Sequence, residues 1–213
     1  MSALFHSIIL FWSIASAAQA LTIHFDDLDA SAGDIDLSGS AYQGYNWTNF
    51  SAYYSLAGFD GLNHGIVSTD IAVYGGGETS ESDHSKPLIS TLSANSPFDL
   101  TNAYFNAVYY DNLDVIVEGL LGNRVLFIKS VTVSAASALL VNFDFNGINR
   151  LNFWAVQTEI TVNPFGCTGF KCTQFTMDSL NIRDVSSYAT APEPSLLMLL
   201  SFGVVLTAIF TRR

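Results

Sequence analysis

The sequence is poor in basic residues. Lys and Arg number 8 against 19 Asp and Glu, which gives a formal net charge of −11 over 213 residues. A surface this acidic cannot neutralise phosphates, so binding to a nucleic-acid backbone is excluded. Neutral glycans, divalent cations and basic surfaces remain as partner classes, unless the acidity serves solubility alone.

Cysteine and histidine are also scarce. The two cysteines are Cys167 and Cys172, and the four histidines are scattered singly, so the ligands of a zinc site are missing. In an exported chain, two cysteines this close predict a disulfide that closes a small loop. Such a short loop removes little chain entropy, so the bond would fix a local turn more than the fold.

No catalytic motif is present. There is no Gly-x-Ser-x-Gly sequence, and no histidine is paired with a Ser or Cys motif that would indicate a triad. Asp26 and Asp27 are adjacent, and in a strand they would point to opposite faces, which does not suit the acid and base of a glycosidase. We therefore predict that the protein is not an enzyme and requires no cofactor. A hydrolase with an unrecognised site is the least favoured alternative.

Helical periodicity is absent between residues 21 and 190, where short stretches alternate apolar and polar residues instead. Asn146-Gly147 and Asn163-Pro164 are among the turn signals between them. The length fits one domain, and the pattern predicts an all-β, antiparallel β-sandwich that is jelly-roll-like, over residues 21–190. The strand candidates are 66–74, 98–108, 113–118, 125–133, 139–145, 151–153 and 175–182.

The most polar stretch is 75–87, which begins Gly75-Gly76-Gly77 and is rich in turn-forming residues. We predict a surface loop there, which could border a binding face.

The N-terminal residues 1–20 have the order of parts of a secretory signal peptide. An apolar stretch runs from Ile8 to Ile14, and Ala18-Gln19-Ala20 forms a small-x-small cleavage site. No Lys or Arg precedes the apolar stretch, so an uncleaved N-terminal anchor is the alternative. We predict cleavage after Ala20 and export.

The C-terminal residues 191–213 carry Pro192-Glu193-Pro194, then an apolar run over 196–210, then Arg212-Arg213. As a helix the run would extend roughly 22 Å, which is short against a hydrocarbon core of about 30 Å but workable with local thinning. The two arginines favour the cytoplasmic side. A plain tail anchor and an apolar core helix are the alternatives.

This tail resembles the PEP-CTERM sorting signal of exopolysaccharide-producing Gram-negative bacteria. The resemblance implies that an exosortase-type membrane transpeptidase recognises Pro192, Glu193 and Pro194. It further implies a precursor anchored in the inner membrane through a transmembrane helix over 196–210, and then a mature protein in the cell envelope or extracellular matrix.

The segment between the two ends contains several short motifs, which include Phe25-Asp26-Asp27-Leu28, Pro97-Phe98-Asp99-Leu100, Phe143-Asp144-Phe145-Asn146-Gly147-Ile148 and Met177-Asp178-Ser179-Leu180. With these motifs the segment resembles exported sandwiches that are carried by many PEP-CTERM proteins and are often built like carbohydrate-binding modules. A non-catalytic envelope or matrix protein with a structural or interaction role is the function we expect. A glycan-binding module is the alternative, with exopolysaccharide as a possible partner.

Three aspartates are candidate calcium ligands. Jelly rolls often bring their terminal strands together, so Asp26 or Asp27 could meet Asp178, and carboxylate oxygens suit Ca²⁺. The alternative is that these acids cap turns and face solvent.

Two tyrosine pairs are candidates for stacking on sugars: Tyr53-Tyr54 and Tyr109-Tyr110. Adjacent residues of a strand point to opposite faces, so one ring of each pair should face outward. Aromatic residues in strands more often belong to the core.

Overall fold

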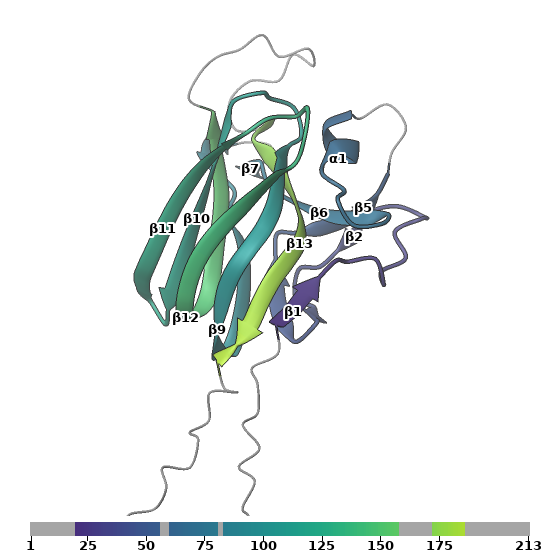
Figure 1. The fold of residues 1–213 in the computed structure, drawn as a ribbon. Helices are drawn as coiled ribbons and strands as arrows, with labels where there is room; N and C mark the ends of the chain where they lie inside the picture. Colours follow the sequence, from purple (N-terminus) through teal and green to yellow (C-terminus); the bar gives the residue numbers. More distant parts are fainter. Residues whose placement is uncertain (1–19, 56–59, 81–82, 158–171, 186–213) are drawn as a thin grey trace, which may run out of the picture. The chain divides into compact units, whose positions relative to one another are not determined.

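The computed structural model describes residues 20–55, 60–80, 83–157 and 172–185. These residues form an antiparallel β-sandwich with one short helix, which confirms the predicted all-β class (Figure 1). The elements are β1 (Ala20–Ile23), β2 (Ile35–Asp36), β3 (Ala41–Tyr42), β4 (Tyr45–Thr48), β5 (Ser51–Tyr54), α1 (Asp60–His64), β6 (Ile71–Gly76), β7 (Glu78–Ser80), β8 (Asp83–Pro87), β9 (Ser90–Ala107), β10 (Leu113–Leu121), β11 (Arg124–Val133), β12 (Leu139–Gln157) and β13 (Gln174–Asp184).

Two long strands, β9 and β12, change layer midway. Their pairing shifts register between Asn142 and Arg150, at a bend that includes Gly147 with a φ of 67°. One half of each strand lies in a layer with β13, β6, β5 and β2. The other half lies in the second layer, with β10 and β11 on one side and β4 on the other. The predicted turn at Asn146-Gly147 is therefore a bend inside one strand.

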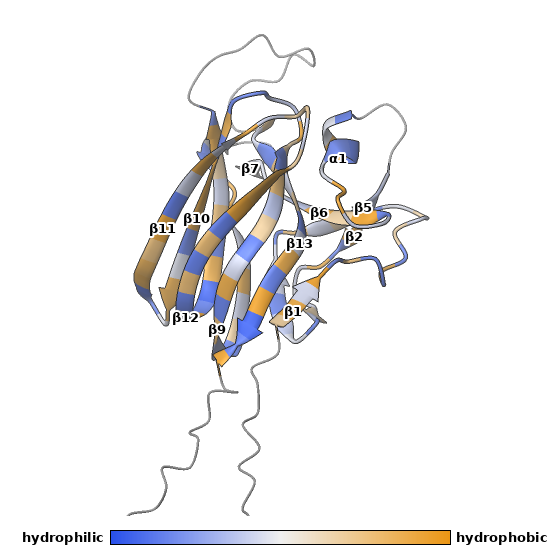
Figure 2. Cartoon of the chain, in the orientation of Figure 1, coloured by the Kyte–Doolittle hydropathy of each residue, from blue (hydrophilic) through white to orange (hydrophobic). Residues whose placement is uncertain are grey.

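The core lies between the two layers and is rich in aromatic rings. Phe105 of one layer contacts Phe153 of the other at 6.2 Å between ring centroids, and Phe50 contacts Phe175 at 6.3 Å. All four rings are fully buried. Ring pairs at this separation add about 0.5–1.5 kcal/mol each beyond the burial of area. Figure 2 shows the alternation of apolar and polar residues along the long strands that makes this core possible.

The period-two pattern predicted most strands correctly. Val115 and Val117 are fully buried in β10, and Phe153 is fully buried in β12, as expected. Leu139 and Val125 are apolar residues of the strand candidates 139–145 and 125–133, but they are 44% and 41% exposed. Leu139 is the first residue of β12, and Val125 is the second residue of β11, which lies at the edge of the sheet.

Two predicted segments are wrong in detail. The strand expected over 66–74 begins only at Ile71, because residues 67–70 donate their backbone N–H groups to carboxylates. The surface loop expected over 75–87 is the end of β6 followed by the hairpin β7–β8. Position 75 belongs to β6 and suits glycine, because a Cβ there would lie 2.5 Å from Ser90 Oγ.

The first and last strands of the sandwich pair with each other. β1 runs antiparallel to β13, with Ile23 opposite Leu180 and Ala20 opposite Arg183. The expectation that terminal strands meet is confirmed. Within the part of the chain that the structure describes, no helix is long and apolar enough to cross a membrane. The signal peptide, the sorting motif and the span 196–210 lie outside the described residues.

Candidate functional site

A cleft of about 490 Å³ opens beside β6, where the turn residues of several segments meet. This volume is within the range of small-molecule sites, about 300–1,000 Å³. Strands β2, β5, β6 and β13 contribute to its walls, together with residues that precede or follow strands, among them Asn49, Leu88 and Tyr109. The described lining is Asp36, Ser38, Asn49, Ser51, Tyr74, Gly75, Gly76, Gly77, Leu88, Tyr109, Cys172 and Gln174. We call this site the tyrosine cleft.

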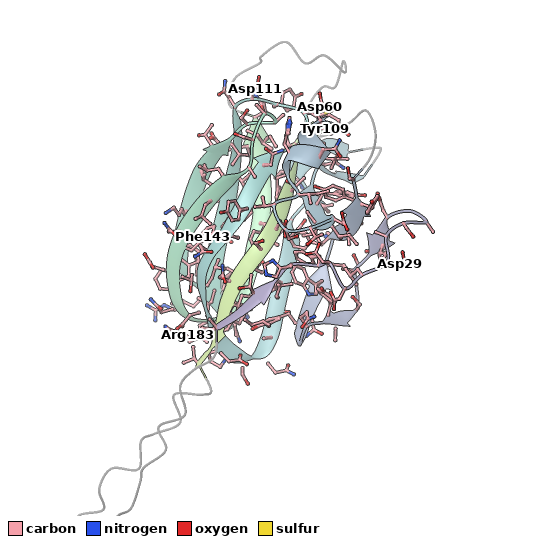
Figure 3. All side chains as sticks on the ribbon, turned by 45° about the vertical axis from the view of Figure 1, so that its right-hand side comes forward. Asp29, Asp60, Tyr109, Asp111, Phe143 and Arg183 are labelled. Atoms are coloured by element: carbon pink, nitrogen blue, oxygen red, sulfur yellow. The ribbon has the colours of Figure 1, made fainter. Side chains whose placement is uncertain are left out.

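Two half-buried tyrosines give the cleft its aromatic surface. Tyr74 lies on β6, and its hydroxyl donates to Asp34 Oδ2 at 2.9 Å. Tyr109 follows the end of β9, at the end of the sandwich where Figure 3 also labels Asp60 and Asp111. Arg183 is labelled at the opposite end. Burial raises the pKa of both tyrosines, and the bond to Asp34 raises that of Tyr74 further, so both rings stay neutral phenols near pH 7.

Glycines bring the backbone close to the cleft. Gly76 has a φ of 78°, and a Cβ on it would lie 2.7 Å from the Thr173 carbonyl oxygen. The Gly76 N–H donates to Ser90 Oγ at 3.0 Å, and Ser90 Oγ donates to the Asn49 carbonyl at 2.7 Å. A side chain at Gly76 would therefore separate β6 from the segment before β13, and the wall would not close.

The polar groups of the lining are held by local hydrogen bonds. Asp36 Oδ1 accepts the Ser38 N–H at 2.8 Å. Hydrogen bonds with the side chain and the backbone of Ser38 hold the pKa of Asp36 below its ordinary value. The Asn49 N–H donates to Ser38 Oγ at 2.9 Å, and its amide Nδ2 donates to the Ile89 carbonyl. Aromatic faces combined with a few fixed polar groups are what a site for a polyhydroxylated ligand needs.

The four predicted stacking tyrosines separate in the structure. Tyr53 and Tyr110 are buried, at 0% and 7% exposure, so neither offers a ring face to a ligand. The Tyr53 hydroxyl instead donates to the Leu62 carbonyl at 2.7 Å. Tyr54 is 43% exposed, and Tyr109 lines the cleft. One ring of each pair faces inward, as alternation along the chain requires, and only Tyr109 reaches the cleft.

The sequence did not indicate Tyr74, Asp36 or Gln174, which complete the cleft. These residues come from separate strands, and nothing in their spacing connects them. The one available signal was Gly75-Gly76-Gly77 directly after an apolar strand, because glycine within a strand often marks a close backbone approach.

Asp26 and Asp178 do converge, on the loop 67–71. Asp178 Oδ2 accepts the N–H groups of Val67 and Ser68, each at 2.7 Å. Asp26 accepts three N–H groups, from Thr69 at 3.3 Å and from the next two residues at 3.0 and 3.2 Å. The Ser68 hydroxyl lies 3.2 Å from an oxygen of each carboxylate. We call this arrangement the aspartate clasp.

The two carboxylates of the clasp differ in burial. Burial raises the pKa of the fully buried Asp178, against the opposing effect of its hydrogen bonds. Partial burial acts in the same direction on Asp26, but its hydrogen bonds from Asp70, Ile71 and Thr69 leave its pKa below the ordinary value. Each oxygen of both carboxylates already accepts an N–H or O–H, so a cation between them would displace donors.

Asp27 lies apart from the clasp. Its carboxylate accepts the Tyr42 hydroxyl and, at 3.0 Å, Gln43 Nε2, both from the β3–β4 hairpin. Asp26 and Asp27 thus serve different partners. Among the described residues, no group of three or more His, Cys, Asp or Glu side chains could hold a metal ion. Calcium at these aspartates stays a prediction.

A Ser–His contact exists that the sequence did not indicate. His24 Nδ1 lies 3.1 Å from Ser179 Oγ, across the pairing of β1 and β13. A triad also needs a carboxylate on the other ring nitrogen. No such contact forms among the described residues, and Ser179 does not line the tyrosine cleft. The pair therefore lacks the arrangement of a hydrolytic site.

Cys172 is buried and lines the tyrosine cleft. Among the described residues no cysteine is a free thiol. Cys167 lies outside the described residues, so the bond between the two stays a prediction.

Comparison with known proteins gives only structural likeness. No family model matches the sequence, and no curated protein matches it. The K1 cleaved adhesin domain of Lys-gingipain from Porphyromonas gingivalis is 11% identical, with 78% of this chain and 98% of that chain covered and a TM-score of 0.44. The CBM22-1 xylan-binding domain of Paenibacillus barcinonensis Xyn10C is 14% identical, with 80% and 97% covered and a TM-score of 0.41.

A third similar structure is TmCBM61 in complex with β-1,4-galactotriose, 6% identical, with 67% of this chain and 90% of that chain covered and a TM-score of 0.36. These structural neighbours are adhesin and carbohydrate-binding sandwiches. At such identities and TM-scores they assign neither a ligand nor a site to this chain.

Proposed function

We propose that this chain is an exported, non-catalytic β-sandwich protein that interacts with an extracellular glycan through the tyrosine cleft. The observation that carries the proposal is the pairing of Tyr74 and Tyr109 with fixed polar groups in a cleft of about 490 Å³. A sugar presents flat C–H faces to the rings and hydroxyls to the polar side chains. The proposal combines the interaction role expected from the sequence with its alternative, a glycan-binding module.

The glycan proposal is tested by a glycan-array screen of the purified full chain, followed by titration with each ligand found. Tyr109→Ala should weaken binding about fivefold or more, since stacking on one aromatic ring contributes about 1–3 kcal/mol in comparable ring contacts. Tyr54→Ala is the matched control, because Tyr54 is exposed but does not line the cleft. Loss of binding in Tyr54→Ala, with Tyr109→Ala unchanged, would place the site elsewhere.

The route to the outside is proposed from the two ends of the sequence. The signal peptide over residues 1–20 would export the chain, and the span 196–210 would hold a precursor in the inner membrane. An exosortase-type transpeptidase would then cleave near Pro192-Glu193-Pro194 and release the protein to the envelope or matrix. Intact-mass measurement from exosortase-competent host cells tests this route. A mature form that retains residues 196–213 would contradict it.

A further inference from the structure

The tyrosine cleft is acidic. Asp36 lies in its wall with an exposed side chain, and Asp34 accepts the hydroxyl of Tyr74, a ring of the same wall. No lysine or arginine belongs to the described lining. The chain as a whole carries a net charge of −11, so the long-range field has the same sign as the local one.

The tyrosine rings act in the same direction as the carboxylates. The face of a neutral phenol is electron-rich and attracts an ammonium group within about 6 Å of the ring centre. The Tyr74 hydroxyl donates a hydrogen bond to Asp34 Oδ2 at 2.9 Å, and Tyr74 therefore remains a neutral phenol. Its ring lies in the cleft wall. A positive group on a ligand would find a ring face and the Asp36 carboxylate in one site.

The remaining polar groups of the cleft suit hydroxyls. Gln174, Asn49 and Ser51 provide amide and hydroxyl groups, which both donate and accept. A uronic acid would bring its carboxylate toward Asp36 without a described cation to compensate, and like charges in a partly desolvated site repel. The cleft therefore selects by charge among sugars of similar shape.

We infer that the cleft binds an amino-sugar polymer whose nitrogen is a free ammonium, in preference to the N-acetylated or uronic-acid counterpart. The inference rests on the proposed glycan-binding function and names the substrate class of the same site. The ammonium would pair with Asp36 in the cleft that Tyr74 also lines, while the ring hydroxyls bond to the amides of Asn49 and Gln174.

The test compares ligands that share a backbone. The purified full chain is titrated with a glucosamine oligomer, its fully N-acetylated form and a galacturonic acid oligomer of equal length. We expect the free-amine oligomer to bind about fivefold more tightly than the acetylated one, the fold-change of one partly exposed charge pair. The galacturonic acid oligomer should bind least.

Two variants localise the effect. Asp36→Asn should remove the preference for the free amine, so that the two glucosamine oligomers bind with equal affinity. Asp29→Asn is the matched control, an exposed acid in the loop after β1 that does not line the cleft (Figure 3). The preference should persist in Asp29→Asn. A preference that survives in Asp36→Asn would overturn the inference.

The outcomes separate this inference from the proposed function. Equal binding of the two glucosamine oligomers, sensitive to Tyr109→Ala, would overturn the charge preference and leave glycan binding in place. No binding of any oligomer, on the array or in titration, would overturn both. Polylysine binding as tight as that of the amino sugar, unaffected by Tyr109→Ala, would show recognition of charge alone and overturn the sugar assignment.

Discussion

The aspartate clasp predicts a large loss of stability on replacing Asp178 by alanine. Asp178 is fully buried, and its Oδ2 accepts the N–H groups of Val67 and Ser68 at 2.7 Å each. The variant leaves both donors without this acceptor, and an unsatisfied donor costs about 1–3 kcal/mol. Because Val67 is at the surface and water can reach part of this loop, we take values near the lower end.

We therefore expect the free energy of unfolding to fall by about 2–3 kcal/mol in Asp178→Ala. For a domain of this size, that corresponds to a melting temperature lower by about 4–12 °C. Asp178→Asn keeps the shape and one carbonyl acceptor, so it should lose about half as much. Asp29→Ala removes only an exposed contact with Ser31 and should leave the melting temperature unchanged.

Amide hydrogen exchange makes the test local. In Asp178→Ala the amides of Val67 and Ser68 should exchange much faster, because their hydrogen bonds are gone. The amide of Val117, in the centre of β10, reports global opening and serves as the reference. A melting temperature within about 2 °C of the parent, with both loop amides still protected, would refute the clasp as the support of this loop.

The remaining predictions concern single features. Gly75→Ala should lower the free energy of unfolding by about 1–3 kcal/mol in denaturant titration, because its Cβ would lie 2.5 Å from Ser90 Oγ; an unchanged midpoint would mean that β6 can shift. Asp26 has a pKa lowered from 3.8, so its contribution is present above that pH and is lost as the pH falls through its folded value; in Asp26→Asn this part of the acid transition should disappear from melts at graded pH. Calcium at about 100 times its Kd should add roughly 2.7 kcal/mol to the free energy of unfolding if it binds the clasp. Identical melting temperatures in EDTA and in calcium would contradict calcium binding there. Non-reducing peptide mapping of exported protein should show Cys167 linked to Cys172, whereas two free thiols would contradict both the bond and export.

The strands could be predicted because burial on one face leaves a period of two in the sequence. Val115, Val117 and Phe153 followed that rule and are fully buried. The rule gave no guidance at Gly75-Gly76, since glycine is typical both of turns and of strands in close contact. The difference depends on Ser90 and Thr173, which approach from distant parts of the chain.

The candidate sites show the same limit. The meeting of Asp26 with Asp178 followed from the pairing of terminal strands, which is a property of the fold class. Their actual partners could not be predicted, because backbone N–H groups of the loop 67–71 leave no mark on its side chains. The tyrosine cleft was found only in part, through Tyr109, since its walls are assembled from strands that are far apart in the sequence.

The position of β13 has a consequence for the order of folding. Among the described residues this strand is the last in sequence, yet it pairs with β1, β6 and β9. These three strands are synthesised earlier and cannot complete their pairing until β13 is present. The loop between Ile23 and Leu180 must close before β1 can pair. Closing a long loop costs chain entropy before the contacts between its ends have formed, and this slows folding. A chain synthesised from its N-terminus would thus stay incompletely folded until β13 is available, and truncation before Gln174 would separate β9 from β6 and leave β1 without its partner strand.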